Sequence, residues 1–362
     1  MLRVPHYTLA TALIALALVG CRDASAPNDV ARSRRAEPRM SDEKGASLVL
    51  HVISPQATDP NIDYVPAVNP QFNHHYVWLD QSVRGNPKLL VFMPGTNNVP
   101  ASWQLLEKEA ARLGYHVIGL MYQNDVEVVG KCGGSEFPIV IPDPDPNTDC
   151  SADMRLEILR GDSVAGSAFV NVTWANSIDN RLSKLLAYLD LNFPDEGWSR
   201  FLEGDGTPKW SQIAVAGQSQ GAGEAALIGT IRQVARVVMF SGPPDARVHG
   251  SVDTWISIGK TPASKYFALF HDRDHLVVGI RANLTAFDME RFGAFVQAEN
   301  SAPPYDGAHV LFTDLQPTLG YAKPNPHQST ARDNNTPIGA DGTPLLRDAW
   351  RYLLGEPPPE DP

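Results

Sequence analysis

Short apolar runs alternate with amphipathic stretches of helical spacing along the chain from about residue 47 onward. The apolar runs are rich in β-branched and aromatic residues, which is typical of buried strands. The predicted strands are Leu48–Ile53, Tyr76–Leu79, Lys88–Met93, His116–Met121, Ile213–Ala216, Val237–Phe240, Tyr266–Phe270 and Val310–Phe312. The predicted helices are Ser102–Leu113, Asn176–Leu191, Gln220–Arg232 and Leu345–Leu354. This alternation predicts an α/β protein with a mostly parallel central sheet and helices on both faces.

The first 20 residues follow a different pattern. Leu9–Val19 is an apolar run of roughly 11 residues, which suits a signal peptide and is too short to span a bilayer. The run ends in the sequence LVGC at Cys21, which resembles the lipobox of bacterial lipoproteins. We therefore expect residues 1–20 to be removed and Cys21 to carry a lipid that anchors the protein at the bacterial cell envelope. An ordinary signal peptide that contains a cysteine is the alternative.

Residues 21–45 are small, polar and charged, so they bury too little apolar surface to offset the entropy lost on ordering. We predict a flexible tether there and a proline-rich tail at residues 357–362. No proline-rich hinge interrupts residues 46–356, which favours one large domain over two.

Composition and charge exclude two classes of protein. The hydrophobic fraction of 43% and the charged fraction of 20% are typical of a globular chain and not of a disordered one. The net charge of −11 argues against a nucleic-acid partner, because such proteins need a basic surface to displace counterions from phosphates.

The most informative motif lies in the segment IAVAGQSQGAG. Gly217, Ser219 and Gly221 form a G-x-S-x-G pattern between a predicted strand and a predicted helix. The glycines allow a sharp turn that lifts the serine hydroxyl above the sheet. The amide of Gln220 then lies at a helix N-terminus, where it can donate to a developing oxyanion.

In this context the motif resembles the nucleophile elbow of the α/β-hydrolase fold. More narrowly, it resembles a group of bacterial α/β hydrolases with a GHSQG-type elbow, although Gln218 stands where that group usually has histidine. The resemblance covers nearly the whole chain after residue 46. It implies an α/β-hydrolase fold, Ser219 as nucleophile and no cofactor.

An oxyanion hole needs a second donor, which this fold takes from the loop after its third strand. That loop has the sequence MPGTNN, and we assign the backbone N–H of Thr96 as the donor, with Gly95 as the alternative.

A serine nucleophile also needs a base and an orienting acid, which follow it in the order acid, then histidine. His327 lies after the last predicted strand and before the closing helix, and it is the predicted base; His309 is the alternative. Asp274 follows the Tyr266–Phe270 strand and is the predicted acid. Asp272 and Asp245 remain alternatives.

Two other features carry possible chemistry. His271 and His275 are four residues apart, but in a loop this spacing has no fixed geometry, so we predict no metal site. The segment at about residues 125–173 is long for a connection and is expected to be an irregular rim or lid over Ser219. It contains Cys132 and Cys150, which we expect to form a disulfide in an exported protein.

Together these features predict a lipid-anchored serine hydrolase whose substrate is a small-molecule or lipid ester. Ester hydrolysis follows from the resemblance, and an acyltransferase or a peptidase would use the same residues. A catalytically inactive envelope lipoprotein that binds a ligand is the alternative from a different class.

Overall fold

The structure, a computed structural model, describes residues 48–83, 88–132, 150–161, 167–245, 252–318 and 324–355. The predicted signal peptide, the lipid attachment at Cys21, the tether and the tail lie outside these residues and stay predictions. Among the described residues, no helix has the length and apolar character needed to cross a bilayer.

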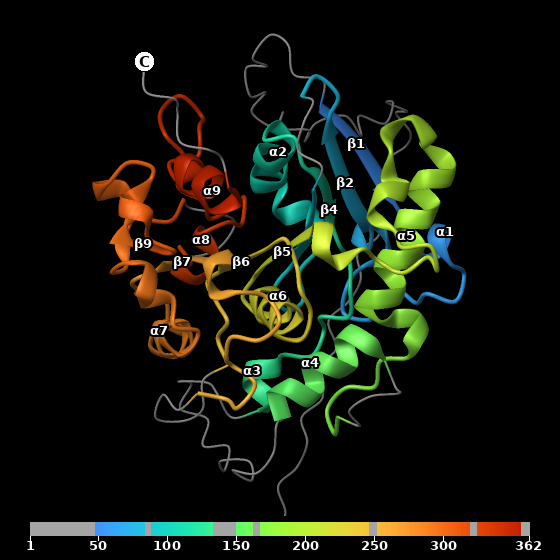
Figure 1. Cartoon of the computed structure of the whole chain (residues 1–362), viewed down its shortest axis with the longest axis horizontal. Helices are drawn as coiled ribbons and strands as arrows, with labels where there is room; N and C mark the ends of the chain where they lie inside the picture. Colours follow the sequence, from blue (N-terminus) through green and yellow to red (C-terminus); the bar gives the residue numbers. More distant parts are fainter. Residues whose placement is uncertain are drawn as a thin grey trace, which may run out of the picture. The chain divides into compact units, whose positions relative to one another are not determined.

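Nine strands in the described part of the chain form one sheet, in the order β1-β2-β4-β3-β5-β6-β7-β9-β8 (Figure 1). They are β1 (Leu48–Ile53), β2 (His75–Asp80), β3 (Leu89–Met93), β4 (His116–Gly119), β5 (Ile213–Gln218), β6 (Arg236–Phe240), β7 (Tyr266–His271), β8 (Val296–Gln297) and β9 (Val310–Thr313). β2 pairs antiparallel with β1 and β4, and the other pairs are all parallel. The predicted α/β-hydrolase fold class, with its mostly parallel sheet, is therefore confirmed.

Helices cover both faces of the sheet, because side chains alternate between the two faces along each strand. On β5, Ile213 and Val215 pack into one apolar cluster, whereas Ala214 and Ala216 pack into the other. The first cluster contains buried residues of α4 (Cys150–Arg160), α5 (Ile178–Asn192), α6 (Gln220–Ile231) and α7 (Val277–Ala286). The second contains those of α2 (Gln104–Arg112) and α9 (Arg347–Leu354). Three helices of four residues each complete the described α-helices: α1 (Pro55–Thr58), α3 (Val128–Lys131) and α8 (Pro326–Ser329).

Several elements of the structure were not predicted from the sequence. The segment expected to be irregular contains α3 and the whole of α4, so that part of the expectation is wrong. α4 was missed because two of its buried positions are charged, Arg155 and Glu157, which obscures the apolar stripe of Met154 and Ile158. α7 and the two-residue strand β8 were also missed.

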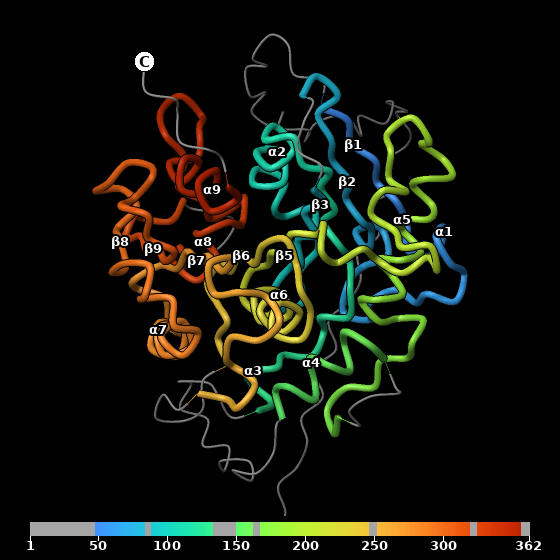
Figure 2. The backbone as a smooth tube through the Cα atoms, in the orientation of Figure 1, coloured from blue at the N-terminus to red at the C-terminus, as the bar shows by residue number. Residues whose placement is uncertain are grey.

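The parallel topology brings distant segments to one edge of the sheet. The turns that follow β3, β5, β6 and β7 all leave the carboxyl ends of neighbouring strands. The tube in Figure 2 shows α8 beside β7 at this edge, although more than 50 residues separate them by the numbering in the chain. Ligand sites of open α/β sheets lie at such an edge.

Candidate active site

Ser219 occupies a strained turn between β5 and α6. Its backbone has φ 56° and ψ −117°, a conformation that residues other than glycine rarely adopt. The surrounding structure holds this conformation, because the Ser219 N–H donates to the carbonyl oxygen of Phe240 at 2.9 Å and the Ser219 carbonyl accepts from Ala222 N at 3.0 Å. The motif therefore forms the sharp strand-to-helix turn that its glycines predict.

The two glycines of the motif are required by close backbone contact. A Cβ on Gly217 would collide with the backbone of Gly221, and a Cβ on Gly221 would collide with the carbonyl of Met93 at the end of β3. The first turn of α6 thus crosses the strands at backbone contact distance, which fixes the position of Ser219 relative to β3.

Asp274 and His327 form a buried hydrogen bond. The Nδ1 atom of His327 lies 2.7 Å from Oδ2 of Asp274, and the two residues are 8% and 2% exposed. An ionised carboxylate only accepts, so Nδ1 carries the proton and Nε2 is the atom available as a base. The other carboxylate oxygen of Asp274 accepts from the Leu276 N–H at 2.9 Å, which fixes the carboxylate plane.

A pocket of about 210 Å³ brings the candidate residues together. Ser219, Gln220, His327 and Thr96 all line it. Asp274 lies behind His327, where its bond orients the imidazole. The structure therefore unites at one site every residue that the sequence assigned to the nucleophile, base, acid and oxyanion hole.

The alternative residues have other partners. His309 stands immediately before β9, and its Nδ1 lies 2.9 Å from the Tyr266 carbonyl at the opposite end of the strands. Asp272 is largely exposed and pairs with Arg281 at 2.6 Å. Asp245 is buried but pairs with Arg155. None of these contacts leads to His327.

The loop after β3 is held against the elbow. The Thr96 hydroxyl donates to Oε1 of Gln220 at 2.7 Å, and the Asn98 side chain donates to the Thr96 carbonyl at 2.8 Å. A Cβ on Gly95 would crowd Gln218 and Ser219, so glycine allows this loop to lie close to the elbow. Thr96 is thereby held beside the N-terminal turn of α6, where the aligned peptide dipoles favour negative charge.

Gln218, which departs from the resembled motif, contacts the candidate base. Its Nε2 donates to the backbone carbonyl of His327 at 2.8 Å, and the residue is 2% exposed. The end of β5 is thereby tied directly to α8. The sequence carries no signal for this contact, because 109 positions separate the two residues.

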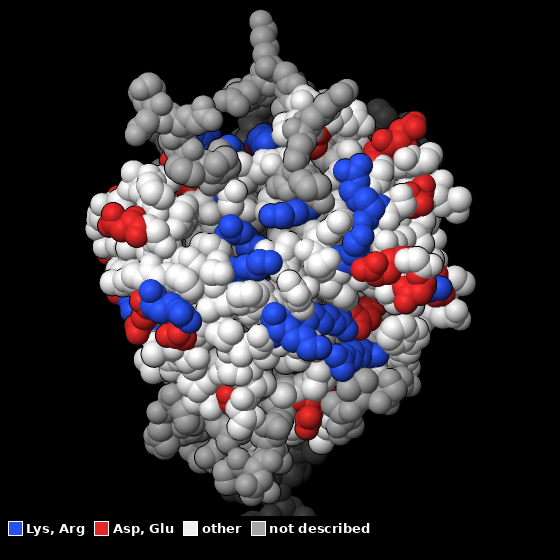
Figure 3. All heavy atoms as spheres, in the orientation of Figure 1, with Lys and Arg blue, Asp and Glu red and all other residues white. Residues whose placement is uncertain are grey.

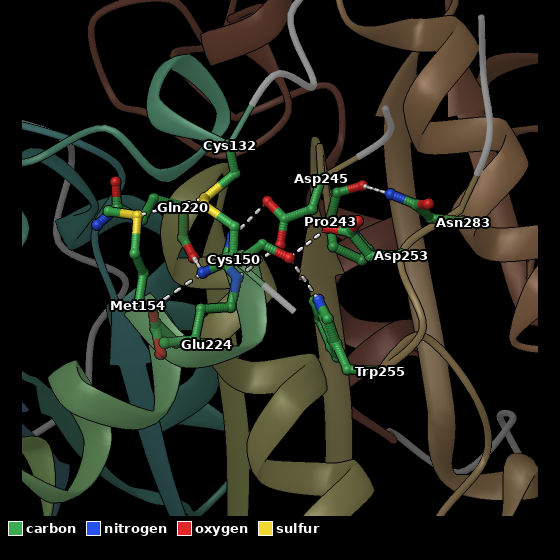
Figure 4. Close-up of polar contacts among 12 residues, drawn as sticks. Cys132, Cys150, Met154, Gln220, Glu224, Pro243, Asp245, Asp253, Trp255 and Asn283 are labelled. Carbon is green, nitrogen blue, oxygen red and sulfur yellow. Dashed lines mark hydrogen bonds and ion pairs between the residues drawn. A yellow bond between two sulfur atoms is a disulfide. The ribbon is translucent and has the colours of Figure 1, made fainter. Parts of the chain in front are cut away.

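Arg155 is the second functional feature that sequence reasoning missed. It is fully buried, and Nε and Nη2 each donate to a carboxylate oxygen of Asp245 at 2.6 Å. Its Nη1 donates to Glu224 Oε1 and to the Gln220 carbonyl, both at 2.9 Å. Figure 4 shows these partners, Gln220, Glu224 and Asp245, close to the disulfide of Cys132 and Cys150.

These contacts connect α4 to the elbow helix. A Cβ on Gly223 would collide with the Arg155 guanidinium, so glycine leaves room for it. Burial raises the pKa of Glu224 to about 8, against the opposing effect of the nearby Arg155. Glu224 is therefore largely protonated at neutral pH, and Asp245 balances the charge of Arg155.

Cys132 and Cys150 form a disulfide that joins the end of α3 to the start of α4. Glu127, Val128 and Val129 line the pocket beside Ser219. α3 therefore forms part of the pocket wall, and the disulfide ties this wall to the helix that carries Arg155.

His271 and His275 do not converge on a metal site. His271 is buried, with Nε2 2.9 Å from the Leu315 carbonyl and Nδ1 accepting from the Arg273 N–H at 3.0 Å. Asp274, His275 and His327 do offer ligand atoms within 4.8 Å of one another. A cation there would compete with the proton that His327 shares with Asp274, so the short bond between them suits proton transfer better than metal binding.

The surface charge is unevenly distributed. Figure 3 shows lysine and arginine side chains gathered across the middle of one face, although the chain as a whole carries a net charge of −11. The net charge therefore does not describe the face shown in Figure 3.

Comparisons with known proteins add little. No family model and no curated protein match the chain. Among solved structures, an esterase from the planctomycete Thermogutta terrifontis aligns with 73% of this chain and 80% of its own, at 11% identity and a TM-score of 0.33. A likeness of this degree carries no argument about activity, which has to come from the site itself.

Proposed function

We propose that the protein is a serine hydrolase that cleaves carboxylic esters through an acyl-enzyme intermediate. The observation that carries the proposal is the buried Asp274–His327 bond in the pocket that also contains Ser219 on its strained turn. A nucleophile, a base and an orienting acid in the chain order Ser, Asp, His are the working parts of this chemistry.

The first half of the reaction acylates Ser219. His327 Nε2 takes the Ser219 proton as the oxygen attacks the ester carbonyl, and a tetrahedral oxyanion forms. The backbone N–H groups of Thr96 and Gln220 stabilise that oxyanion. When the intermediate collapses, the bond to the alcohol breaks and His327 gives its proton to the departing oxygen.

The second half regenerates the enzyme. Water attacks the acyl-serine ester, His327 takes the proton of the water, and the carboxylic acid leaves as the proton returns to Ser219. Asp274 keeps the proton on Nδ1 throughout and stabilises the imidazolium. Every proton in this cycle is returned, so no cofactor is required.

We further propose that the active site operates in the bacterial cell envelope. This rests on the lipobox-like sequence at Cys21 and on the Cys132–Cys150 disulfide, which is typical of oxidising compartments. The substrate is a small-molecule or lipid ester.

Steady-state and burst kinetics with p-nitrophenyl acetate test the proposal. The wild type should release p-nitrophenol with saturation kinetics, and Ser219→Ala should reduce the rate to the solution background. Thr254→Ala, which lies outside the pocket, is the matched control. Ester cleavage that survives Ser219→Ala would contradict the proposal.

A further inference from the structure

The buried side chain of Gln220 has a hydrogen-bond partner for only one of its two polar atoms among the described residues. Gln220 is 3% exposed and lines the pocket beside Ser219. Its Oε1 accepts the hydroxyl proton of Thr96 at 2.7 Å, whereas its Nε2 has no hydrogen-bond partner among the described residues. The backbone of Gln220 is fixed as well, because its carbonyl accepts from Arg155 at 2.9 Å.

This arrangement leaves the nitrogen end of the amide without a partner in the described part of the chain. The hydroxyl of Thr96 donates to the amide oxygen, so the NH₂ group is the end left to donate. A buried donor without a partner costs about 1–3 kcal/mol, a cost that an acceptor on a bound ligand removes. A site with such a donor therefore discriminates against analogues that lack the acceptor.

The geometry of the proposed reaction places this donor on the acyl side of the ester. His327 delivers its proton to the departing alcohol, so the alcohol lies beside His327. The Gln220 side chain is bonded instead to Thr96, the other proposed donor to the carbonyl oxygen. An acyl group that leads away from His327 passes this side chain.

The pocket limits the size and polarity of that acyl group. Its volume of about 210 Å³ lies below the range of roughly 300–1,000 Å³ that is usual for small-molecule sites. Its lining is mixed: Asn98, Asn325 and Gln328 line it together with Val128, Val129 and Leu276. The small volume limits the length of the acyl chain, and the polar part of the lining allows that chain to carry an oxygen atom.

Resting on the proposed ester hydrolysis, we propose that the Gln220 side-chain amide determines specificity. It donates to an oxygen atom close to the scissile carbonyl, on the acyl side. The favoured substrates are esters of short alkoxy or hydroxy acids, and plain alkanoyl esters are poorer substrates.

A pair of nearly isosteric esters tests this inference. p-Nitrophenyl methoxyacetate and p-nitrophenyl butyrate share their leaving group and differ by one ether oxygen in place of a methylene. To correct for intrinsic reactivity, kcat/KM of each ester is divided by its rate constant of alkaline hydrolysis. The wild type should then favour the methoxyacetate by about tenfold or more. On the alcohol side, 2-methoxyethyl acetate and butyl acetate should react at similar normalised rates.

Variants locate the source of the preference. Gln220→Met removes the donor, and Gln220→Glu keeps an oxygen for the Thr96 hydroxyl but replaces the NH₂ group; both should abolish the preference for the ether ester. Gln328→Met is the matched control, because this glutamine also lines the pocket and its Oε1 accepts a hydrogen bond from Arg332. It should keep the wild-type ratio.

Thr96→Val removes the hydroxyl that orients the amide. It should lower kcat/KM for the ether ester more than for the butyrate, and so reduce the preference for the ether ester. A wild type that cleaves both esters without preference, or a preference that appears only in the alcohol-side pair, would overturn the inference and leave ester hydrolysis intact. A wild type that cleaves neither ester would instead contradict the proposed function.

Discussion

Two buried aspartates at the same edge of the sheet have different partners. Asp245 follows β6 and is 3% exposed; Asp274 follows the neighbouring strand β7 and is 2% exposed. Asp245 binds the guanidinium of Arg155 through two bonds of 2.6 Å, whereas Asp274 binds the imidazole of His327 through one bond of 2.7 Å. The two aspartates are therefore alike in burial and in position at the sheet edge, and they differ in the side chain that each one binds.

The difference teaches what makes a buried carboxylate catalytic. Arginine stays protonated throughout the accessible pH range, so the pair of Asp245 with Arg155 cannot transfer a proton and acts as a fixed structural joint. A neutral imidazole can bind a proton at its free ring nitrogen and release it again, so the pair of Asp274 with His327 can accept and return a proton. This difference supports the proposal that Asp274 takes part in the reaction and that Asp245 supports the elbow.

The largest expected effect concerns activity. Asp274→Asn should lower kcat/KM by about 10³–10⁴-fold, because an amide no longer holds the proton on Nδ1 of His327. Ester hydrolysis measures the effect. Asp272→Asn is the control, since Asp272 is exposed and pairs with Arg281, and it should stay within about twofold of the wild type. Equal losses in the two variants would contradict the assignment of the acid.

Next in size is the stability of the structural joint. Arg155→Met should lower the free energy of unfolding by about 3–5 kcal/mol, because it leaves the Asp245 carboxylate buried without a cation. Urea denaturation followed by circular dichroism measures it. The double variant Arg155→Met with Asp245→Leu removes both charges and should recover part of the loss. A single variant as stable as the wild type would show that this ion pair is not a structural joint.

The pH dependence of stability sharpens the same point. The folded-state pKa of Glu224 is raised to about 8 by burial, so the folded protein holds this proton more tightly than the unfolded chain. Its contribution to stability is complete below the unfolded pKa and is lost as the pH rises through about 8.

Glu224→Gln cannot lose that proton. Between pH 5 and pH 9, the variant should gain on the order of 3 kcal/mol in unfolding free energy relative to the wild type. Urea denaturation across the pH range measures this difference. Parallel pH profiles for the two proteins would count against a protonated Glu224.

A smaller effect is expected from the disulfide near Arg155. Cys132→Ser with Cys150→Ser should cost about 2–3 kcal/mol of stability, since it releases the restraint on a loop of 18 positions. Thermal unfolding measures the loss. If α3 and α4 form the pocket wall, the double variant should also change the relative rates with acetyl and butyryl esters. An unchanged substrate profile would contradict that role.

The elbow could be predicted from the sequence because its chemistry is local. Gly217, Ser219 and Gly221 lie within five positions, and the strand and helix around them have clear patterns. The resulting turn needs glycine at its two contact points whatever the rest of the chain does. The mostly parallel sheet was predicted in the same way, from the alternation of apolar runs and helices.

The sequence identified the elbow, but it did not decide which of the three aspartates is the acid. Asp245, Asp272 and Asp274 all follow strands at the same edge, and their burial and their partners distinguish them. Those partners, Arg155 and His327, lie 90 and 53 positions away in the chain. The charged Arg155 also concealed the helix that carries it, because a buried ion pair resembles a solvated position in the hydrophobic pattern.

Labelling with a fluorophosphonate probe, followed by mass spectrometry of the peptides, tests the central claim most directly. The probe forms a stable bond only with a serine that a neighbouring base activates. We predict one adduct on Ser219 in the wild type and in folded Asp245→Asn. Labelling should be strongly slowed in Asp274→Asn and absent in Ser219→Ala. A folded wild type that remains unlabelled, or one labelled equally fast with and without Asp274, would contradict the account.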